Sequence, residues 1–322
     1  MNNKRIVEIS KSLLSIEHKF LFWIISCFSL FLSVHTAKSQ SMMSSVFACR
    51  VAANPAYATV RGIPSVQVYR NSQWSSFPGS PVTYSAIAEV PFTRQFGVGV
   101  VYFQDQAGLL TKKRASLLAA YNVQFDEYNE VSFGLGFAFF NQNLDYSKIS
   151  NTDPVQQNDP QAANYNSASF SLDGDFGLYY QYNKMIGLSI SLPNVKAQFI
   201  DKNPNKTIDN TIFSGAINGI FDLQGDILKL EPSIGANVTK YWGTGINVGA
   251  RVTYENQVSA TTIVDSRGSF TYGLGFMYNN RFLLNTYHIL NFSDASRVAG
   301  SALEFGLLVF FGERSLFSYD YQ

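Results

Sequence analysis

Residues 131–140 read VSFGLGFAFF, and this stretch decides the fold. Large apolar side chains alternate with small ones, and a period of two residues is the pattern of a β-strand. One bulky and one small face are typical of a strand with lipid on its outer side and a crowded lumen on its inner side. The bulky face consists of Val131, Phe133, Leu135, Phe137 and Phe139, and the small face of Ser132, Gly134, Gly136 and Ala138.

The same division recurs in residues 272–278 and 303–311. With further stretches that read as strands the total is about fourteen, and most have near the nine to eleven residues that a tilted strand needs to cross a bilayer. We therefore predict an all-β fold, a transmembrane outer-membrane antiparallel β-barrel of about 14 strands. The other expected strands are 63–74, 81–90, 95–105, 114–124, 170–182, 185–192, 211–221, 226–239, 243–255, 257–265 and 281–290.

A secreted β-sandwich is the alternative fold, because its strands also alternate. Charged residues make up 15% of the sequence and aromatic residues 15%, whereas a soluble domain has about 25% charged residues. A sandwich would carry charged side chains on its outer face, but here the face opposite Phe and Leu is often Gly, Ala or Ser. Both observations favour the barrel, and a closed barrel also leaves no exposed strand edge.

The connections between the expected strands differ in length. Residues 278–281 form a short turn, whereas 141–167 and 193–210 are long and rich in Asn, Asp, Gln, Pro and Ser. Bacterial barrels have short periplasmic turns and longer outer loops, so we expect these two loops at the cell surface. The basic residues Lys112, Lys113 and Arg114 are expected in a solvated turn.

The first forty residues predict export. Basic residues precede an apolar run over 20–34, and small residues follow it, which is the order of a signal peptide. Cleavage before a lipid-modified Cys27 is the alternative. We expect four parts: a cleaved signal peptide (1–39), an N-terminal segment (40–62), the β-barrel (63–311) and a C-terminal tail (312–322). Removing the five basic and two acidic residues of 1–39 from totals of 24 and 23 leaves 19 basic and 21 acidic residues, so nucleic acid is not an expected partner.

Few residues suit catalysis or metal binding. His288 is the only histidine after residue 39, and it is expected to bond to a neighbour near the rim or in the lumen; the alternative is a general base, as in a lipase. Asp173 and Asp175 are expected in a turn or at a strand end, and calcium is the alternative. Tyr179, Tyr180 and Tyr182 are expected in an aromatic girdle. We predict no enzymatic activity, no catalytic residue, no cofactor and no metal site.

Three short motifs carry a family resemblance. NPAYA at 54–58, YRNSQW at 69–74 and FPGSPVTY at 77–84 follow one another in the order and spacing of the PorP/SprF family, which belongs to the type IX secretion and gliding machinery of Bacteroidetes. The chain departs from that family at Thr59, where glycine is frequent, and at Leu303-Glu304, where a His-Glu pair is common. The motif residues, expected to be structural or to dock a partner, are Asn54, Pro55, Ala56, Tyr57, Tyr69, Arg70, Gln73, Trp74, Pro78, Gly79 and Pro81.

The resemblance implies a bacterial outer-membrane protein that supports export or surface attachment of a partner. The implied partners are membrane lipid, other type IX components, and a secreted cargo or adhesin with a C-terminal sorting domain. The alternative function is a passive porin or a channel for hydrophobic solutes. The physical reading of NPAYA itself is a turn before the first strand, in which Pro55 fixes its own φ and holds Asn54 extended. We expect it to anchor the N-terminal segment at the start of the barrel, on the periplasmic side.

Overall fold

The computed structural model describes residues 47, 49–74, 79–144, 169–196, 211–223, 227–239, 243–292 and 300–312. The expected signal peptide and all of the expected tail beyond Gly312 lie outside these ranges. Two helical elements come first, α2 (Arg50–Ala53) and the 3-10 helix η1 (Pro55–Thr59). The strands are β1 (Ser65–Ser72), β2 (Val82–Pro91), β3 (Phe96–Ala107), β4 (Leu110–Gln124), β5 (Asn129–Leu144), β6 (Ser169–Tyr182), β7 (Ile186–Leu192), β8 (Thr211–Gly219), β9 (Phe221–Asp222), β10 (Leu228–Thr239), β11 (Gly243–Tyr254), β12 (Val258–Asp265), β13 (Ser269–Tyr278), β14 (Phe282–Asn291) and β15 (Ala302–Phe310).

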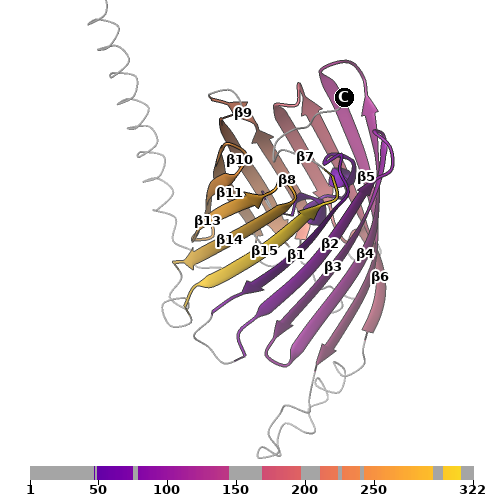
Figure 1. Cartoon of the computed structure of the whole chain (residues 1–322). Helices are drawn as coiled ribbons and strands as arrows, with labels where there is room; N and C mark the ends of the chain where they lie inside the picture. The colour runs from indigo at the N-terminus through magenta and orange to yellow at the C-terminus, as the bar shows by residue number, and fades with distance from the viewer. Residues whose placement is uncertain are drawn as a thin grey trace, which may run out of the picture.

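The strands close into an antiparallel barrel (Figure 1). Each strand pairs with its neighbour in the chain, and β1 pairs with β15 to complete the circle. The two-residue β9 continues β8: Ser233 faces Asn218 and Leu230 faces Phe221, so both pieces keep one register along β10. Pro232, which lacks an N–H, lies opposite the interruption. Over the described residues the wall therefore has fourteen strands, and the predicted fold class is confirmed.

Side chains divide between the two faces of the wall as predicted. Along β13, for example, exposed and buried residues alternate without a break from Thr271 to Tyr278. Within the described ranges, no helix is long and apolar enough to cross a membrane. Exposed apolar side chains of the outer face include Val66, Val68, Val100, Leu117, Phe133, Leu135, Phe137, Leu188, Ile217, Ile234, Ile246, Val252, Leu274, Phe276, Leu284 and Phe305. Buried polar side chains of the inner face include Gln67, Asn71, Glu89, Asn122, Glu130, Gln181, Ser189, Glu231, Asn247, Arg251, Thr261, Asn285 and Glu304.

The two ends of the barrel differ in their connections. Ser65, where the first strand begins, pairs with Phe310, where the last strand ends, so both chain ends of the barrel lie together. Following the short-turn rule for bacterial barrels, we name this end periplasmic and the opposite end outer. The connections at the periplasmic end are 92–95, 125–128, 183–185, 223–227, 255–257 and 279–281, and those at the outer end are 73–81, 108–109, 145–168, 193–210, 240–242, 266–268 and 292–301.

Several local predictions were wrong. β4 begins at Leu110, so Lys112, Lys113 and Arg114 lie within a strand and not in a turn. β5 continues to Leu144, which shortens the expected loop 141–167 at its start. In both cases charged or amide side chains resemble a loop in sequence, but they extend a strand beyond the apolar band.

The pair Asp173 and Asp175 lies within β6, not in a turn or at a strand end. Arg114 of β4 donates to Asp175 at 2.6 Å, past β5, which lies between the two strands. Asp175 also accepts the backbone N–H of Asn194. Asp173 accepts the backbone N–H of Lys196. The two carboxylates therefore tie the chain beyond β7 to the inner face of β6, which sequence spacing did not reveal.

We expect Arg114→Ala to destabilise the barrel by about 2 kcal/mol, because it leaves the partly buried Asp175 carboxylate without its cation. The measurement is the urea midpoint of unfolding in detergent micelles, followed by tryptophan fluorescence. Lys113→Ala, one residue away on the same strand and exposed, is the matched control. Equal midpoints for the two variants would contradict the assigned role of the ion pair.

Candidate functional site

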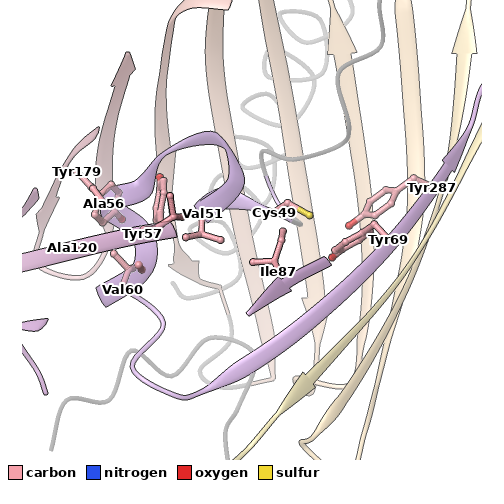
Figure 2. Close-up of a cluster of buried hydrophobic side chains, with 12 residues drawn as sticks. Cys49, Val51, Ala56, Tyr57, Val60, Tyr69, Ile87, Ala120, Tyr179 and Tyr287 are labelled. Atoms are coloured by element: carbon pink, nitrogen blue, oxygen red, sulfur yellow. The ribbon is translucent and has the colours of Figure 1, made fainter. Parts of the chain in front are cut away.

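The segment that precedes the first strand enters the barrel and crosses its lumen (Figures 1 and 2). We call residues 49–61 the plug. Its helix η1 packs against β2, β3, β4, β5 and β6, and Arg50 at its start reaches Glu231 on β10, across the lumen. The buried cluster of Figure 2 contains plug residues and inward side chains of the wall. The NPAY residues Asn54, Pro55, Ala56 and Tyr57 are all buried there.

Asn54 fixes the fold of the plug and joins it to the wall. Its backbone is extended, with φ −149°, and Pro55 follows at the first position of η1, as expected for a residue before proline. The Asn54 Oδ1 atom caps the helix by accepting the Ala56 N–H at 2.9 Å. Its Nδ2 atom lies within hydrogen-bond distance of the Leu178 carbonyl (3.0 Å), the Ser189 Oγ (2.9 Å) and the Ile190 carbonyl (3.0 Å). Both ends of the amide are thus satisfied at a residue that is 1% exposed.

Glycines on three strands of the wall make room for the plug. A Cβ atom at Gly97 would overlap the carbonyl of Ala58, and one at Gly134 would overlap the backbone of Pro55 and Ala56. A Cβ atom at Gly177 would overlap the Asn54 Oδ1 atom. These positions lie on β3, β5 and β6, so the wall is shaped for the backbone of the plug and not only for its side chains.

Three inward tyrosines fill space around the plug. Tyr57 of the plug packs on Tyr179 of β6, with ring centroids 4.5 Å apart and planes inclined by 40°. Tyr69 and Tyr287 lie over glycines of the adjacent strands, Gly306 and Gly273, where a Cβ atom would meet their rings. Tyr179 was expected in the aromatic girdle, and this is wrong, because its ring points into the lumen and is 2% exposed.

Cys49, the first residue of the plug, lies beside Tyr69 and Tyr287 of the wall and is fully buried (Figure 2). Burial in this apolar surrounding raises the pKa of its thiol well above the ordinary value, and the nearby Glu304 carboxylate acts in the same direction. The thiol is therefore neutral near pH 7 and a poor nucleophile in the observed conformation.

Ion pairs hold both ends of the plug to the wall. Arg50 Nη2 lies 3.2 Å from Glu231 Oε1, and Arg251 of the wall lies 3.7 Å from the other oxygen of the same carboxylate. At the other end, Arg61 Nη1 lies 3.1 Å from Glu89 Oε1. Both glutamates are nearly buried, so these pairs are stronger than exposed ones. The inner wall is charged here, unlike the inward positions of 131–140 and 272–278 that the sequence had singled out.

The remaining motif residues do not lie in the plug site, except Tyr69. Arg70 points outward, over the Tyr84 ring at 6.0 Å. Near the outer end, the Gln73 N–H donates to the Pro81 carbonyl, and Gly79 accepts from the Gly108 N–H. Trp74 and Gly79 have positive φ values of 51° and 78°, as in tight turns, and Pro78 lies outside the described residues. The family motif therefore serves two places: NPAY fills the lumen, and the later part shapes the connection from β1 to β2.

Thr59, where the family often has glycine, is accommodated without strain in the plug. Its Oγ1 lies 3.3 Å from the Ala56 carbonyl and 3.2 Å from Ser132 Oγ. At the other departure the changed residue is Leu303, an exposed apolar side chain on the outer face of β15. Glu304, which keeps the glutamate of the family pair, is fully buried and accepts from Asn71 Nδ2 at 3.1 Å.

His288 was expected near the rim or in the lumen with a hydrogen-bonded neighbour. It belongs to the outward row of β14 near the outer end of the barrel and not to the lumen, and it has the expected neighbours: Tyr272 Oη lies 2.5 Å from Nδ1 and Ser301 Oγ lies 2.6 Å from Nε2. Among the residues that the structure describes, no group of three or more His, Cys, Asp or Glu side chains could hold a metal ion.

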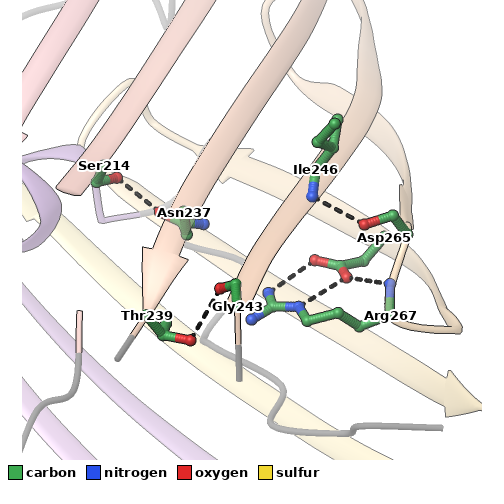
Figure 3. Close-up of polar contacts among 8 residues, drawn as sticks. Ser214, Asn237, Thr239, Gly243, Ile246, Asp265 and Arg267 are labelled. Atoms are coloured by element: carbon green, nitrogen blue, oxygen red, sulfur yellow. Dashed lines mark hydrogen bonds and ion pairs between the residues drawn. The ribbon is translucent and has the colours of Figure 1, made fainter. Parts of the chain in front are cut away.

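The outer end next to β11 is tied by short polar contacts (Figure 3). Arg267 donates to both oxygens of Asp265, at 2.9 and 2.8 Å, and this carboxylate raises the pKa of the guanidinium. Ser266 Oγ accepts the Ile246 N–H, and Thr239 Oγ1 donates to the Gly243 carbonyl. The short turns on this side of the outer end are therefore held in place.

Sequence reasoning identified the NPAY residues but missed the ion pairs that hold the plug. The members of each pair, Arg50 with Glu231 and Arg61 with Glu89, lie in different parts of the chain, and nothing in their local sequence pairs them. A signal was present in the inward glycines Gly97, Gly134 and Gly177, since a glycine within a strand often marks close approach of another backbone.

Comparison with known proteins places the chain in a family. Solved structures with similar folds include the outer-membrane protein Omp33 of Acinetobacter baumannii, 5% identical, covering 77% of this chain and 98% of that one, with a TM-score of 0.47. The CymD monoaromatic hydrocarbon channel is 12% identical, with 82% and 91% covered and a TM-score of 0.44, and the KdgM porin is 9% identical, with 77% and 99% covered and a TM-score of 0.37. A comparison with curated proteins found no match. The model of the family "Type IX secretion system membrane protein PorP/SprF" matches residues 36–308, most of the sequence, and the chain therefore belongs to this family.

Proposed function

We propose that this chain is a non-enzymatic outer-membrane component of the type IX secretion and gliding system, which supports export or surface attachment of a partner protein with a C-terminal sorting domain. Family membership supports the secretion context. The observation that carries the proposal is the plug: a segment that crosses the lumen and is bonded to opposite walls suits a platform better than a conduit. Export through a signal peptide in residues 1–39 is part of the proposal.

The partner would engage the outer end of the barrel. Every connection of more than five residues lies there, including 145–168 and 193–210. The turns at the periplasmic end have at most five residues. In this arrangement the cargo reaches the surface by another component and is held at the rim of this barrel. Other type IX components and membrane lipid are the remaining proposed partners.

The test is capture from native outer membranes with the affinity-tagged full chain, followed by mass spectrometry. We expect a sorting-domain protein and type IX components among the captured proteins. A variant with 145–168 replaced by a short Gly-Ser linker should lose the sorting-domain protein. A control variant with 125–128, at the periplasmic end, replaced by the same kind of linker should retain it. Recovery of neither class of partner with the unmodified chain would overturn the proposal.

A passive porin is the competing function. An open porin needs a continuous aqueous lumen, and the plug with its bonds to β6, β7 and β10 argues against one. We therefore propose closure to solutes as part of the function, and conductance of the purified chain decides between the two.

We also propose that the Tyr272, His288 and Ser301 cluster has a structural role. Its hydrogen bonds link β13, β14 and the start of β15 at the outer end. We expect the unmodified chain in detergent to hydrolyse no p-nitrophenyl esters above the rate of empty micelles, and His288→Ala to leave that rate unchanged. Hydrolysis that is lost in His288→Ala but retained in the exposed-turn variant Arg281→Ala would contradict this assignment.

A further inference from the structure

The plug has the features of a hinged closure. We propose that residues 49–61 exist in two positions, the observed closed position and a released one in which the plug swings about Gly62 and opens the lumen. This inference concerns the barrel alone and does not depend on the identity of any partner.

The wall can lose the plug without leaving its buried carboxylates unpaired. Glu231 keeps Arg251, whose Nη1 lies 3.7 Å away, when Arg50 departs. Arg251 in turn keeps Thr261 Oγ1 and Tyr287 Oη, each at 3.3 Å, when it loses the Phe47 ring. Since an orphaned buried charge is a large cost of breaking an ion pair, this second partner lowers the free energy of release.

The other anchor is built in the same way. When Arg61 departs, Glu89 keeps Gln67, whose Nε2 lies 3.1 Å from Oε1. Each wall glutamate that binds a plug arginine therefore has a polar partner on the wall itself. Each glutamate thus has a partner whether the plug is closed or released. A switching element requires two such discrete positions.

The connection to the barrel allows the swing. Gly62 has a φ of +68°, and no atom would lie within 4 Å of a Cβ there, so the chain has both backbone freedom and open space. Directly after it, Pro64 and Ser65 are fixed to the wall, since the Pro64 carbonyl accepts the Phe311 N–H and Ser65 starts β1. A free glycine between a plug and a fixed strand is the geometry of a hinge.

Cys49 provides a reporter of plug position. It is the only cysteine after residue 27, and it is fully buried in the closed position. In a Cys27→Ser background, we expect a maleimide-polyethylene glycol to modify Cys49 slowly in folded protein in outer-membrane vesicles and rapidly after denaturation. The double variant Arg50→Gln, Arg61→Gln should raise the folded-state labelling rate about tenfold or more, because it removes both anchors while the wall pairs remain.

Controls separate release from misfolding. Arg281→Gln changes an exposed arginine in a turn at the periplasmic end and should not alter labelling. The substitutions Thr59→Cys and Ser132→Cys, at two positions whose native oxygens lie 3.2 Å apart, should form a disulfide that holds the plug in place. With that lock oxidised the double anchor variant should return to slow labelling of Cys49, and reduction should restore fast labelling of Cys49, with the modified cysteine identified by peptide mass spectrometry. Slow labelling in the unlocked anchor variant, or fast labelling despite the oxidised lock, would overturn the hinged-plug proposal.

Discussion

Gly177→Ala is expected to displace the plug and to destabilise the folded barrel by about 1–3 kcal/mol. The added methyl group would overlap Asn54 Oδ1 and crowd Pro55 Cδ, so either the cap of η1 or the wall of β6 must move. Because the Asn54 side chain also bonds to Ser189 of the wall, the change should weaken the attachment of the whole plug. The measurement is the urea midpoint of unfolding in micelles, together with the labelling rate of Cys49.

Gly174→Ala is the matched control for this variant. It lies on the same strand but on the outer face, where the nearest atom to a new Cβ is the Gly136 carbonyl oxygen at an ordinary 3.5 Å. We expect it to have the midpoint and the labelling rate of the unmodified chain. If both alanine variants behave alike, the close approach of Gly177 to Asn54 has no energetic weight and the described plug site is wrong.

Asn54→Ala should have the second large effect, a loss of about 2–4 kcal/mol. The change removes the cap that accepts the Ala56 N–H, leaving that buried donor unsatisfied, and it removes the contacts of Nδ2 with two carbonyls and a hydroxyl on β6 and β7. Unfolding in urea gives the free energy, and Cys49 labelling tells whether the loss is local to the plug.

An exposed asparagine provides the comparison. Asn143→Ala removes the same chemical group near the outer end of β5 and should change stability by less than about 0.5 kcal/mol. Asn54→Asp is informative as well, since it keeps the capping oxygen but loses the donor to the wall. It should retain η1 but raise the labelling rate of Cys49, because the plug loses its bonds to the wall. A stability equal to that of the unmodified chain would show that the wall contacts of Asn54 are dispensable.

The barrel was predictable because its signal is local and repeated. In 131–140 and 272–278 the size of each side chain indicates which face of the strand it lies on. This alternation can be recognised without knowing which strand is the neighbour. The start of β4 was not predictable in this way, since Lys112 and Arg114 have the composition of a turn. Only the fold shows that Asp175 of β6, beyond β5, lies beside Arg114.

The plug was only partly predictable. Asn54 and Pro55 specify a local turn and cap, and these exist. The position of that turn depends on contacts with Ser189 and Glu231, which are more than a hundred residues away, and on glycines whose meaning appears only when a second backbone lies against them. Local propensity fixes such a segment's shape, whereas its location is set by long-range packing.

The central claim is that the N-terminal segment closes the lumen of this outer-membrane barrel. Conductance of the purified full chain in planar lipid bilayers tests it most directly, with the Arg50→Gln, Arg61→Gln variant measured beside it. We predict no sustained conductance for the unmodified chain and discrete openings for the variant. Stable, size-dependent open-channel currents from the unmodified chain, equal to those of the variant, would contradict the account.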